Sequence, residues 1–289
     1  MMSTFRNWLE VRNVQSRAVV IARPAAGGDS SGWLLVPRGP ARGVVVSVHG
    51  TGNDALYPQI SLFKALLRRR YAVLAFDLDG HGRSSTALLG ADTLKEAVPA
   101  ALALVRDELP GLRVSLVGQS LGGALALQAA AARPKGLVSV VLISVPLELT
   151  MGRMRLAPEL RSFAAVAFAR QMATYGPWGM LPAAGPFKRR RFPVRLASGG
   201  GMFANYLTTV AGILNGMQLV EKVAPQVKVP VLCLNGTLDP IAPPTDGRAL
   251  AEALPHGEFR ELSGCGHLTA ALALATERAV GEWLDDHHP

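Results

Sequence analysis

Cysteine is scarce in this sequence: Cys233 and Cys265 are the only two in 289 residues. Two cysteines cannot build a disulfide framework, and a chain of this length can bury a sizeable hydrophobic core without one. Long apolar runs are also missing, because the run over 137–147 is interrupted by serines and a proline and falls short of the roughly 18 residues that a membrane span needs. The first twelve residues carry three charged side chains, which is not the pattern of a signal peptide. We therefore expect reduced thiols, no transmembrane segment and a cytoplasmic location.

Acidic residues are sparse between positions 148 and 222, where three of them stand against ten lysines and arginines. This segment holds most of the formal net charge of +9. No stripe of basic residues with interleaved aromatic side chains and no nucleic-acid motif accompanies the charge, so we expect no nucleic acid as a partner. The run from Lys188 to Arg191 predicts a local basic surface. Its simplest interpretation is a solvated loop, and the alternative is a weak contact with anionic lipid or an acidic carrier.

Apolar runs and amphipathic segments alternate along most of the chain. Two β-rich stretches around a Gly-rich turn predict an antiparallel strand pair, and the later apolar runs predict buried strands. We expect strands at 16–23, 33–37, 43–49, 71–77, 114–117, 137–145, 229–235 and 258–262. We expect helices at 56–70, 93–109, 246–254 and 268–283, with Thr93-x-x-Glu96 as a capping box. This order predicts an α/β fold with a mostly parallel sheet covered by helices on both faces.

The alternation stops between positions 147 and 227. Prolines recur there, clean strands are absent and Gly199-Gly200-Gly201 forms a flexible patch. We interpret 147–227 as a mostly helical cap inserted after the sixth strand, with residues 1–146 and 228–289 forming the two parts of the core. The cap is rich in methionine and aromatic residues, which either pack it onto the core or line an acyl pocket.

A Gly-x-Ser-x-Gly motif lies at Gly118-Gln119-Ser120-Leu121-Gly122, between a β-rich apolar run and a helix-favouring run of small residues. Strand, sharp turn and helix are the context that a nucleophile elbow requires. The two glycines let strand and helix cross closely while Ser120 takes a strained backbone conformation. The simpler interpretation of the motif alone is a Gly-rich turn before a helix, but the flanking context favours Ser120 as a nucleophile.

A serine hydroxyl needs a base to remove its proton and a third group to orient that base. Of the six histidines, His267 follows the last predicted strand in a Gly-rich loop that opens a helix. Ligands bind at this carboxyl edge of an open α/β sheet, so we predict His267 as the base. The alternative is a capping or surface histidine. His287 and His288 are expected to lie in the C-terminal tail.

The acid is expected on the same edge, between the elbow and the histidine. Asp239 follows a buried strand in a Pro-fixed loop and gives the order Ser, Asp, His that this kind of site uses. Its alternative interpretation is a structural turn aspartate. Glu148 is a weaker substitute for the acid, and Asp77 and Asp79 are expected to shape their own loop. We predict a Ser120–His267–Asp239 triad.

An oxyanion that develops during acyl transfer needs two positioned donors. The backbone N–H of Leu121, which follows the nucleophile, is one candidate. The loop after the third strand supplies the other, and Thr51 in His49-Gly50-Thr51-Gly52 is the best candidate there. The simpler interpretation of that loop is a tight turn.

Five motifs occur in one order: His49-Gly50, Asp77-x-x-Gly80-His81-Gly82-x-Ser84, Gly118-x-Ser120-x-Gly122-Gly123, Gly236-x-x-Asp239 and Gly266-His267. With them the chain resembles the α/β-hydrolase superfamily, and within it the capped serine hydrolases similar to monoacylglycerol lipases and lysophospholipases. The resemblance covers about residues 40–145 and 228–285. The cap matches no subfamily pattern, so the resemblance implies the fold and the serine chemistry and leaves the substrate open.

These observations predict a serine hydrolase that cleaves small-molecule esters with small to medium acyl chains through an acyl-enzyme, without a metal or a cofactor. An aspartate at position 120 would be expected in a dehalogenase or an epoxide hydrolase, so those activities are disfavoured. Acyl transfer, peptidase or thioesterase activity would use the same acyl-enzyme and stays open. A non-catalytic binding protein is disfavoured because each predicted triad position is filled. The sequence does not give the oligomeric state.

Overall fold

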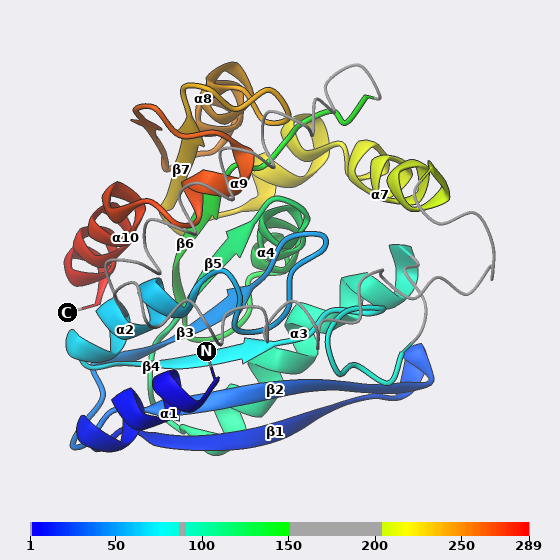
Figure 1. Ribbon diagram of the computed structural model, residues 1–289. Coiled ribbons are helices and arrows are strands. Elements are labelled where there is room, and N and C mark those ends of the chain that lie inside the picture. Colours follow the sequence, from blue (N-terminus) through cyan, green and yellow to red (C-terminus); the bar gives the residue numbers. More distant parts are fainter. Residues whose placement is uncertain (1, 87–90, 151–203, 289) are drawn as a thin grey trace, which may run out of the picture.

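The computed structural model describes residues 2–86, 91–150 and 204–288. Its centre is an eight-stranded sheet in the order β1-β2-β4-β3-β5-β6-β7-β8 (Figure 1). The strands are β1 (Gln15–Arg23), β2 (Gly28–Val36), β3 (Gly43–Val48), β4 (Tyr71–Phe76), β5 (Val114–Gln119), β6 (Leu137–Ile143), β7 (Val231–Gly236) and β8 (Gly257–Leu262). β2 runs antiparallel to both β1 and β4, and every other neighbouring pair is parallel. The predicted α/β class with a mostly parallel sheet is confirmed.

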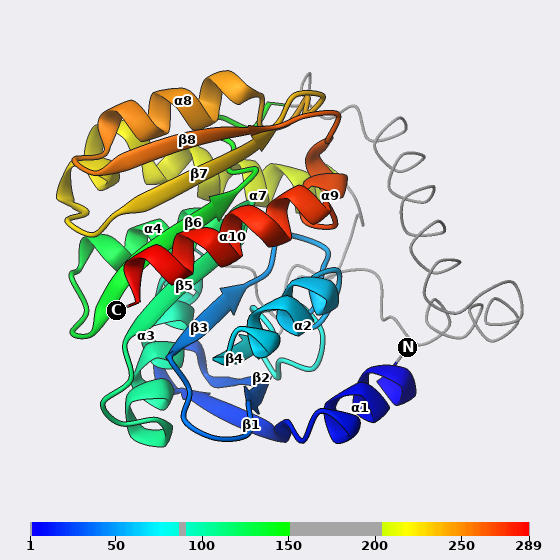
Figure 2. The same ribbon diagram turned by 90° about the vertical axis from the view of Figure 1, so that its left-hand side faces the viewer.

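Eight α-helices are assigned in the described residues, and they cover both faces of the sheet. They are α1 (Met2–Val11), α2 (Ile60–Arg68), α3 (Ala91–Glu108), α4 (Leu121–Ala131), α7 (Ala204–Met217), α8 (Pro244–Ala253), α9 (His267–Ala270) and α10 (Leu274–His287). In Figure 2, α2 and α10 lie in front of the sheet and α3 and α4 lie behind it. No helix among the described residues combines the length and the apolar character that a membrane crossing requires.

Successive side chains of a strand point to opposite faces of the sheet. Since helices cover both faces, the inner strands are buried on both sides. In β3, Val44, Val46 and Val48 belong to one core cluster, which includes side chains of α3, α4, α7 and α8. Val45 between them belongs to a second cluster, which includes side chains of α2 and α10. The valines of β3 therefore supply both cores, and a strand buried on both faces is apolar along most of its length.

Three predicted helix boundaries are wrong. α2 begins at Ile60, four residues after the predicted start. α3 begins at Ala91, so Thr93 lies in its first turn and is not the N-cap of a capping box. The predicted closing helix is two helices, because Ala273 takes an extended conformation with ψ 138° between α9 and α10. The Thr276 hydroxyl donates to the Ala270 carbonyl at 2.6 Å and so ties the two helices together across the break.

The described ends of the predicted cap pack on the core. α7 is followed by a π-helical turn, Leu219–Val223, and a 3-10 turn, Ala224–Gln226. Asn215 of α7 accepts a hydrogen bond from the Leu149 N–H at 2.8 Å and donates one to the Leu149 carbonyl at 3.2 Å, so the two ends meet. Met217 is buried in the core cluster and serves packing there. The rest of the cap prediction, with the basic run and the three glycines, falls on 151–203, outside the described residues.

His288 is not in a free tail, contrary to the prediction. It is 1% exposed, and its Nε2 lies 2.7 Å from the Ser115 hydroxyl, which in turn lies 2.7 Å from the Ser139 hydroxyl. Gly43 makes room for the ring, because a Cβ at that position would lie 2.2 Å from His288 Nδ1. His288 thus connects the end of α10 to the amino ends of β3, β5 and β6. The elbow lies at the other, carboxyl ends of the strands.

We expect the His288 contact to make stability depend on pH. Burial, with smaller contributions from Arg42, Arg113 and His287, lowers the pKa of His288 from 6.5 to about 4, while Asp285 opposes the shift. The unfolded chain therefore binds this proton at a higher pH than the folded chain, so stability is full above about pH 6.5 and declines as the pH falls toward 4.

The test compares the melting temperature of the wild type with that of His288→Phe between pH 7 and pH 4. Phenylalanine keeps the edge contact with the Tyr71 ring, whose centroid lies 5.1 Å from that of His288, and removes the titrating group. We expect the variant to be less stable at pH 7 and to lose less stability on acidification. His256→Asn, at an exposed histidine, is the control. Equal pH slopes for wild type and His288→Phe would contradict the expectation.

Candidate active site

Ser120 lies in a sharp turn between the end of β5 and the start of α4. Its backbone has φ 50° and ψ −122°, a left-handed conformation that side chains rarely adopt. Two glycines permit the close crossing: a Cβ on Gly118 would lie 2.5 Å from Gly123 Cα, and one on Gly122 would lie 2.3 Å from the Val48 carbonyl oxygen. The turn is anchored to the next strand by the Ser120 N–H, which donates to the Ile143 carbonyl at 2.9 Å. The local sequence therefore builds the strand, sharp turn and helix that a nucleophile elbow requires.

The structure brings Ser120, His267 and Asp239 into one hydrogen-bonded chain. His267 Nε2 lies 3.1 Å from Ser120 Oγ, and His267 Nδ1 lies 3.0 Å from Asp239 Oδ2 and 3.1 Å from Oδ1. A carboxylate can only accept, so the neutral imidazole carries its proton on Nδ1 and presents the Nε2 lone pair to the serine hydroxyl. The three side chains come from segments that follow β5, β7 and β8, all at the carboxyl edge of the sheet.

Asp239 is held in place by its own loop. Its Oδ1 accepts hydrogen bonds from the backbone N–H groups of Ile241 at 2.9 Å and Ala242 at 2.8 Å. The residue is 3% exposed, and Asn235 fixes the same loop by donating to the Ala242 carbonyl at 3.0 Å. The carboxylate therefore reaches His267 already oriented. Glu148, the alternative acid, has an exposed side chain.

The loop after β3 lies against Ser120, as the oxyanion prediction requires. A Cβ on Gly50 would lie 3.3 Å from Ser120 Cβ, which places the Gly50 backbone beside the nucleophile and Thr51 directly after it. Leu121 is the first residue of α4, where a backbone N–H has no acceptor within its helix. The Thr51 hydroxyl is buried and makes no hydrogen bond with the described residues. Both predicted donors therefore belong to segments next to Ser120.

Two histidines connect the loop after β3 with the loop after β4, which the sequence did not predict. His49 Nε2 accepts a hydrogen bond from the Leu78 N–H at 3.0 Å, and His81 Nε2 accepts one from the Gly52 N–H at 3.0 Å. Each ring keeps its proton on Nδ1, which donates to a carbonyl within its own loop at 2.8 Å. We call His49 and His81, with these two hydrogen bonds, the crossed histidines. Thr51 directly precedes Gly52, whose N–H one of them binds.

The crossed histidines accept only while their Nε2 atoms are unprotonated. Burial lowers the pKa of His49, and burial together with the neighbouring His49 lowers the pKa of His81 to about 3. Asp77 adds a third link, because its carboxylate accepts from the Ala55 N–H at 2.7 Å and from the Arg83 N–H at 2.8 Å. The motif residues His49, Asp77 and His81 thus hold the loop after β3 and the loop after β4 together. The only signal in the sequence was their place in the matched motifs.

No group of three or more His, Cys, Asp or Glu side chains that could hold a metal ion occurs in the part of the chain that the structure describes. Cys233 and Cys265 are both free thiols, and burial raises the pKa of Cys233 to about 12. The structure thus brings a serine hydroxyl, an imidazole and a carboxylate together at one edge of the sheet.

Comparisons with known proteins find hydrolases among those similar to this chain. The family model Hydrolase_4, described as serine aminopeptidase, S33, matches residues 39–271. A monoglyceride lipase from Homo sapiens is 29% identical over 215 residues, which are 70% of this chain and 67% of that protein. The acetyltransferase component of an acetoin cleaving system from Pseudomonas putida is 40% identical over 100 residues, 35% of this chain, so that the match spans only 26% of that protein.

Among solved structures, a thermostable carboxyl esterase from Bacillus coagulans superposes with a TM-score of 0.70 at 15% identity. The superposition covers 95% of this chain and 99% of that one. At this identity the likeness concerns the fold alone.

Proposed function

The chain belongs to the serine aminopeptidase S33 family of hydrolases, and from this membership and the site geometry we propose that it cleaves carboxylic esters of small to medium acyl chain. The proposal rests chiefly on one observation, the hydrogen-bonded chain from Ser120 Oγ through His267 to Asp239. In general terms, the chain is an esterase or lipase-type hydrolase of this fold. The triad and its covalent intermediate are the specific part of the proposal.

In the first half-reaction, Ser120 Oγ attacks the ester carbonyl carbon while its proton passes to His267 Nε2. Asp239 stabilises the imidazolium that forms and keeps it oriented. The carbonyl oxygen becomes an oxyanion, and the N–H groups of Leu121 and Thr51 are the proposed donors to it. When the tetrahedral intermediate collapses, the bond to the alkoxy group breaks and His267 returns the proton to the leaving alcohol.

In the second half-reaction, water takes the place of the alcohol. His267 removes a proton from the water as it attacks the acyl-enzyme, and the second collapse releases the carboxylic acid and restores the Ser120 hydroxyl. An alcohol or an amine that reaches the acyl-enzyme before water would turn the same intermediate into acyl transfer. A peptide bond in the first step would make the enzyme a peptidase. The products of the assays below distinguish these outcomes.

The covalent step is tested with a fluorophosphonate probe, which phosphonylates an activated serine. We expect one probe per chain, located on Ser120 by peptide mass spectrometry, and slower labelling in the presence of p-nitrophenyl butyrate. Labelling of a different serine, or no labelling of a protein that hydrolyses the ester, would overturn the assignment of Ser120.

Acyl-chain length is expected to control the rate. The sequence over 151–206, most of which lies outside the described residues, is rich in methionine and aromatic residues, and from this composition we propose an apolar site for the acyl chain. Each buried methylene stabilises by about 0.8 kcal/mol, so kcat/KM should rise about three- to fourfold per added carbon until the pocket is filled. A series of p-nitrophenyl esters from acetate to decanoate, kept below micelle formation, measures this. A strict preference for acetate would contradict the pocket.

Two further predictions stay part of the proposal. A cytoplasmic location is proposed from the scarcity of cysteine in the sequence, which offers no disulfide framework. A weak contact of the run from Lys188 to Arg191 with anionic lipid or an acidic carrier rests on the sequence alone, since the run lies outside the described residues.

A further inference from the structure

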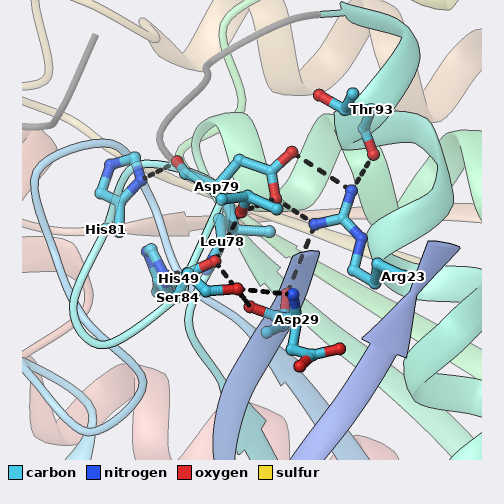
Figure 3. A network of polar contacts seen from close by, with 11 residues as sticks. Arg23, Asp29, His49, Leu78, Asp79, His81, Ser84 and Thr93 are labelled. Atoms are coloured by element: carbon cyan, nitrogen blue, oxygen red, sulfur yellow. Dashed lines mark hydrogen bonds and ion pairs between the residues drawn. The ribbon is translucent and has the colours of Figure 1, made fainter. Parts of the chain in front are cut away.

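Arg23, the last residue of β1, places its guanidinium in the interior of the protein. Its side chain is buried, with 1% of the residue exposed, and it forms an ion pair with Asp79 in the loop after β4. Figure 3 shows the two side chains facing each other. Both guanidinium Nη atoms reach the carboxylate, with Nη2 to Oδ2 at 3.2 Å, and the group also donates to the Thr93 carbonyl and to the Ser30 hydroxyl. One arginine thereby joins β2, the loop after β4 and the first turn of α3.

A buried ion pair of this kind is not explained by stability. Removing two charges from water is unfavourable, and their attraction in the interior roughly balances that loss. Apolar side chains of the same volume often stabilise a fold as well or better. What an arginine–carboxylate pair adds is geometry, because the planar guanidinium fixes both oxygens of its partner in one orientation. The question is therefore which part of the molecule needs Asp79 in a fixed place.

The contacts of Asp79 lead to the loop that carries Thr51. Its carboxylate accepts from the Thr86 hydroxyl at 2.8 Å, which links positions 79 and 86 within the loop after β4. Its carbonyl accepts from His81 Nδ1 at 2.8 Å, and His81 Nε2 in turn accepts from the Gly52 N–H at 3.0 Å. Gly52 follows Thr51 directly. Three consecutive links thus run from the guanidinium to the peptide beside the proposed oxyanion donor.

We propose that Arg23 is a positioning residue for the oxyanion donor loop, acting through Asp79 and His81. The inference rests on the proposed function, because it assumes that the Thr51 N–H receives the developing charge. Arg23 holds the Asp79 carboxylate and so fixes the turn from which His81 projects. The imidazole then holds the Gly52 N–H, and the Thr51 peptide keeps its direction toward the nucleophile. Lysine cannot replace it fully, because a single ammonium lacks the planar fork that reaches both carboxylate oxygens and the Thr93 carbonyl together.

The test replaces the ion pair without leaving a lone buried charge. In Arg23→Met with Asp79→Leu, apolar side chains of similar volume keep the interior filled, whereas the single Arg23→Met variant would leave Asp79 unpaired and is open to unfolding. Arg23→Lys is the conservative variant. Arg17→Met is the control. Arg17 lies on the same strand as Arg23, and the change removes its 2.5 Å ion pair with Glu108 at the end of α3, where both side chains are partly exposed.

The readout separates binding of the substrate from stabilisation of the transition state. For p-nitrophenyl butyrate we expect kcat of the double variant to fall about tenfold, a fraction of the 10²–10³-fold that loss of a whole oxyanion donor causes, with KM within about twofold. Butylboronic acid forms a tetrahedral adduct on Ser120 whose oxygen carries charge like the oxyanion, so its affinity should fall by the same factor. Arg23→Lys should lie between, and Arg17→Met should match the wild type.

Melting curves accompany each variant, so that loss of folded protein is measured separately. A folded double variant with wild-type kcat overturns the proposal, and so does one in which kcat falls while the affinity for butylboronic acid is unchanged. If the double variant does not fold, Arg23→Lys decides, and wild-type values of kcat and boronic-acid affinity in that variant overturn the proposal. Ser120→Ala is measured in parallel: full activity there refutes the proposed function itself, independently of what Arg23 does.

A second pair of variants tests the two links that His81 makes, to the Asp79 carbonyl and to the Gly52 N–H. His81→Leu removes the acceptor for the Gly52 N–H, and His81→Gln keeps a side-chain oxygen that can accept in its place. We expect His81→Leu to lose kcat and boronic-acid affinity together, and His81→Gln to recover most of both. Equal activity of the two folded variants would show that the hydrogen bond from the Gly52 N–H to position 81 does not position the Thr51 N–H. It would overturn the proposal that Arg23 acts through His81.

Discussion

Replacing Ser120 by alanine is expected to reduce ester hydrolysis about 10⁶-fold, the loss seen when the nucleophile of a serine triad is removed. The hydroxyl is the only group in the chain of hydrogen bonds from Asp239 that can form the acyl bond. Without it, His267 can act only on water that no longer has an acyl-enzyme to attack. The measurement is the initial rate with p-nitrophenyl butyrate, corrected for spontaneous hydrolysis, together with loss of fluorophosphonate labelling.

The control for this experiment is Ser120→Gly. Both variants lack the nucleophile, but the backbone at this position has φ 50°, which glycine adopts more readily than alanine or serine. Relief of such a conformation is worth about 1–3 kcal/mol, so the glycine variant should melt higher than the alanine variant while both stay inactive. Either variant with more than about one hundredth of the wild-type rate would mean that another residue forms the acyl-enzyme.

Those parts of the fold and site that depend on local pattern could be predicted from the sequence. The valine run of β3 shows a strand buried on both faces because each residue of the run must find an apolar neighbour. The elbow is equally local in sequence, since Gly118, Ser120 and Gly122 lie within five residues. The positions of Asp239 and His267 follow from parallel strands, whose carboxyl ends meet at one edge of the sheet.

Contacts between distant segments could not be predicted in this way. Arg23 and Asp79 are 56 positions apart, and nothing in either neighbourhood indicates that an arginine at the end of an outer strand turns inward. The same holds for His288, which looks like part of a tail until the space left by Gly43 is known. The order of the strands depends on the crossovers between them, which composition and periodicity do not encode. For these features the sequence supplies residues whose partners only the fold reveals.

Replacing Asp239 by asparagine is expected to slow turnover about 10⁴-fold with little change in the fold, as loss of the orienting aspartate does in the serine protease template. The reason lies in the hydrogen bonds around its two oxygens. The N–H groups of Ile241 and Ala242 both donate to Oδ1. An asparagine would keep its amide oxygen there and turn its NH₂ group toward His267 Nδ1.

Two donors cannot face each other, so in Asp239→Asn the imidazole would move its proton to Nε2 and lose the lone pair that now faces Ser120 Oγ at 3.1 Å. The matched variant is Glu148→Gln, at the alternative acid, whose exposed side chain should tolerate the change with full activity. Rates with p-nitrophenyl butyrate at pH 7 and melting curves for both variants make the comparison. A nearly silent Asp239→Asn beside an inactive Glu148→Gln would show that Glu148 orients the base; the reverse pattern assigns that role to Asp239.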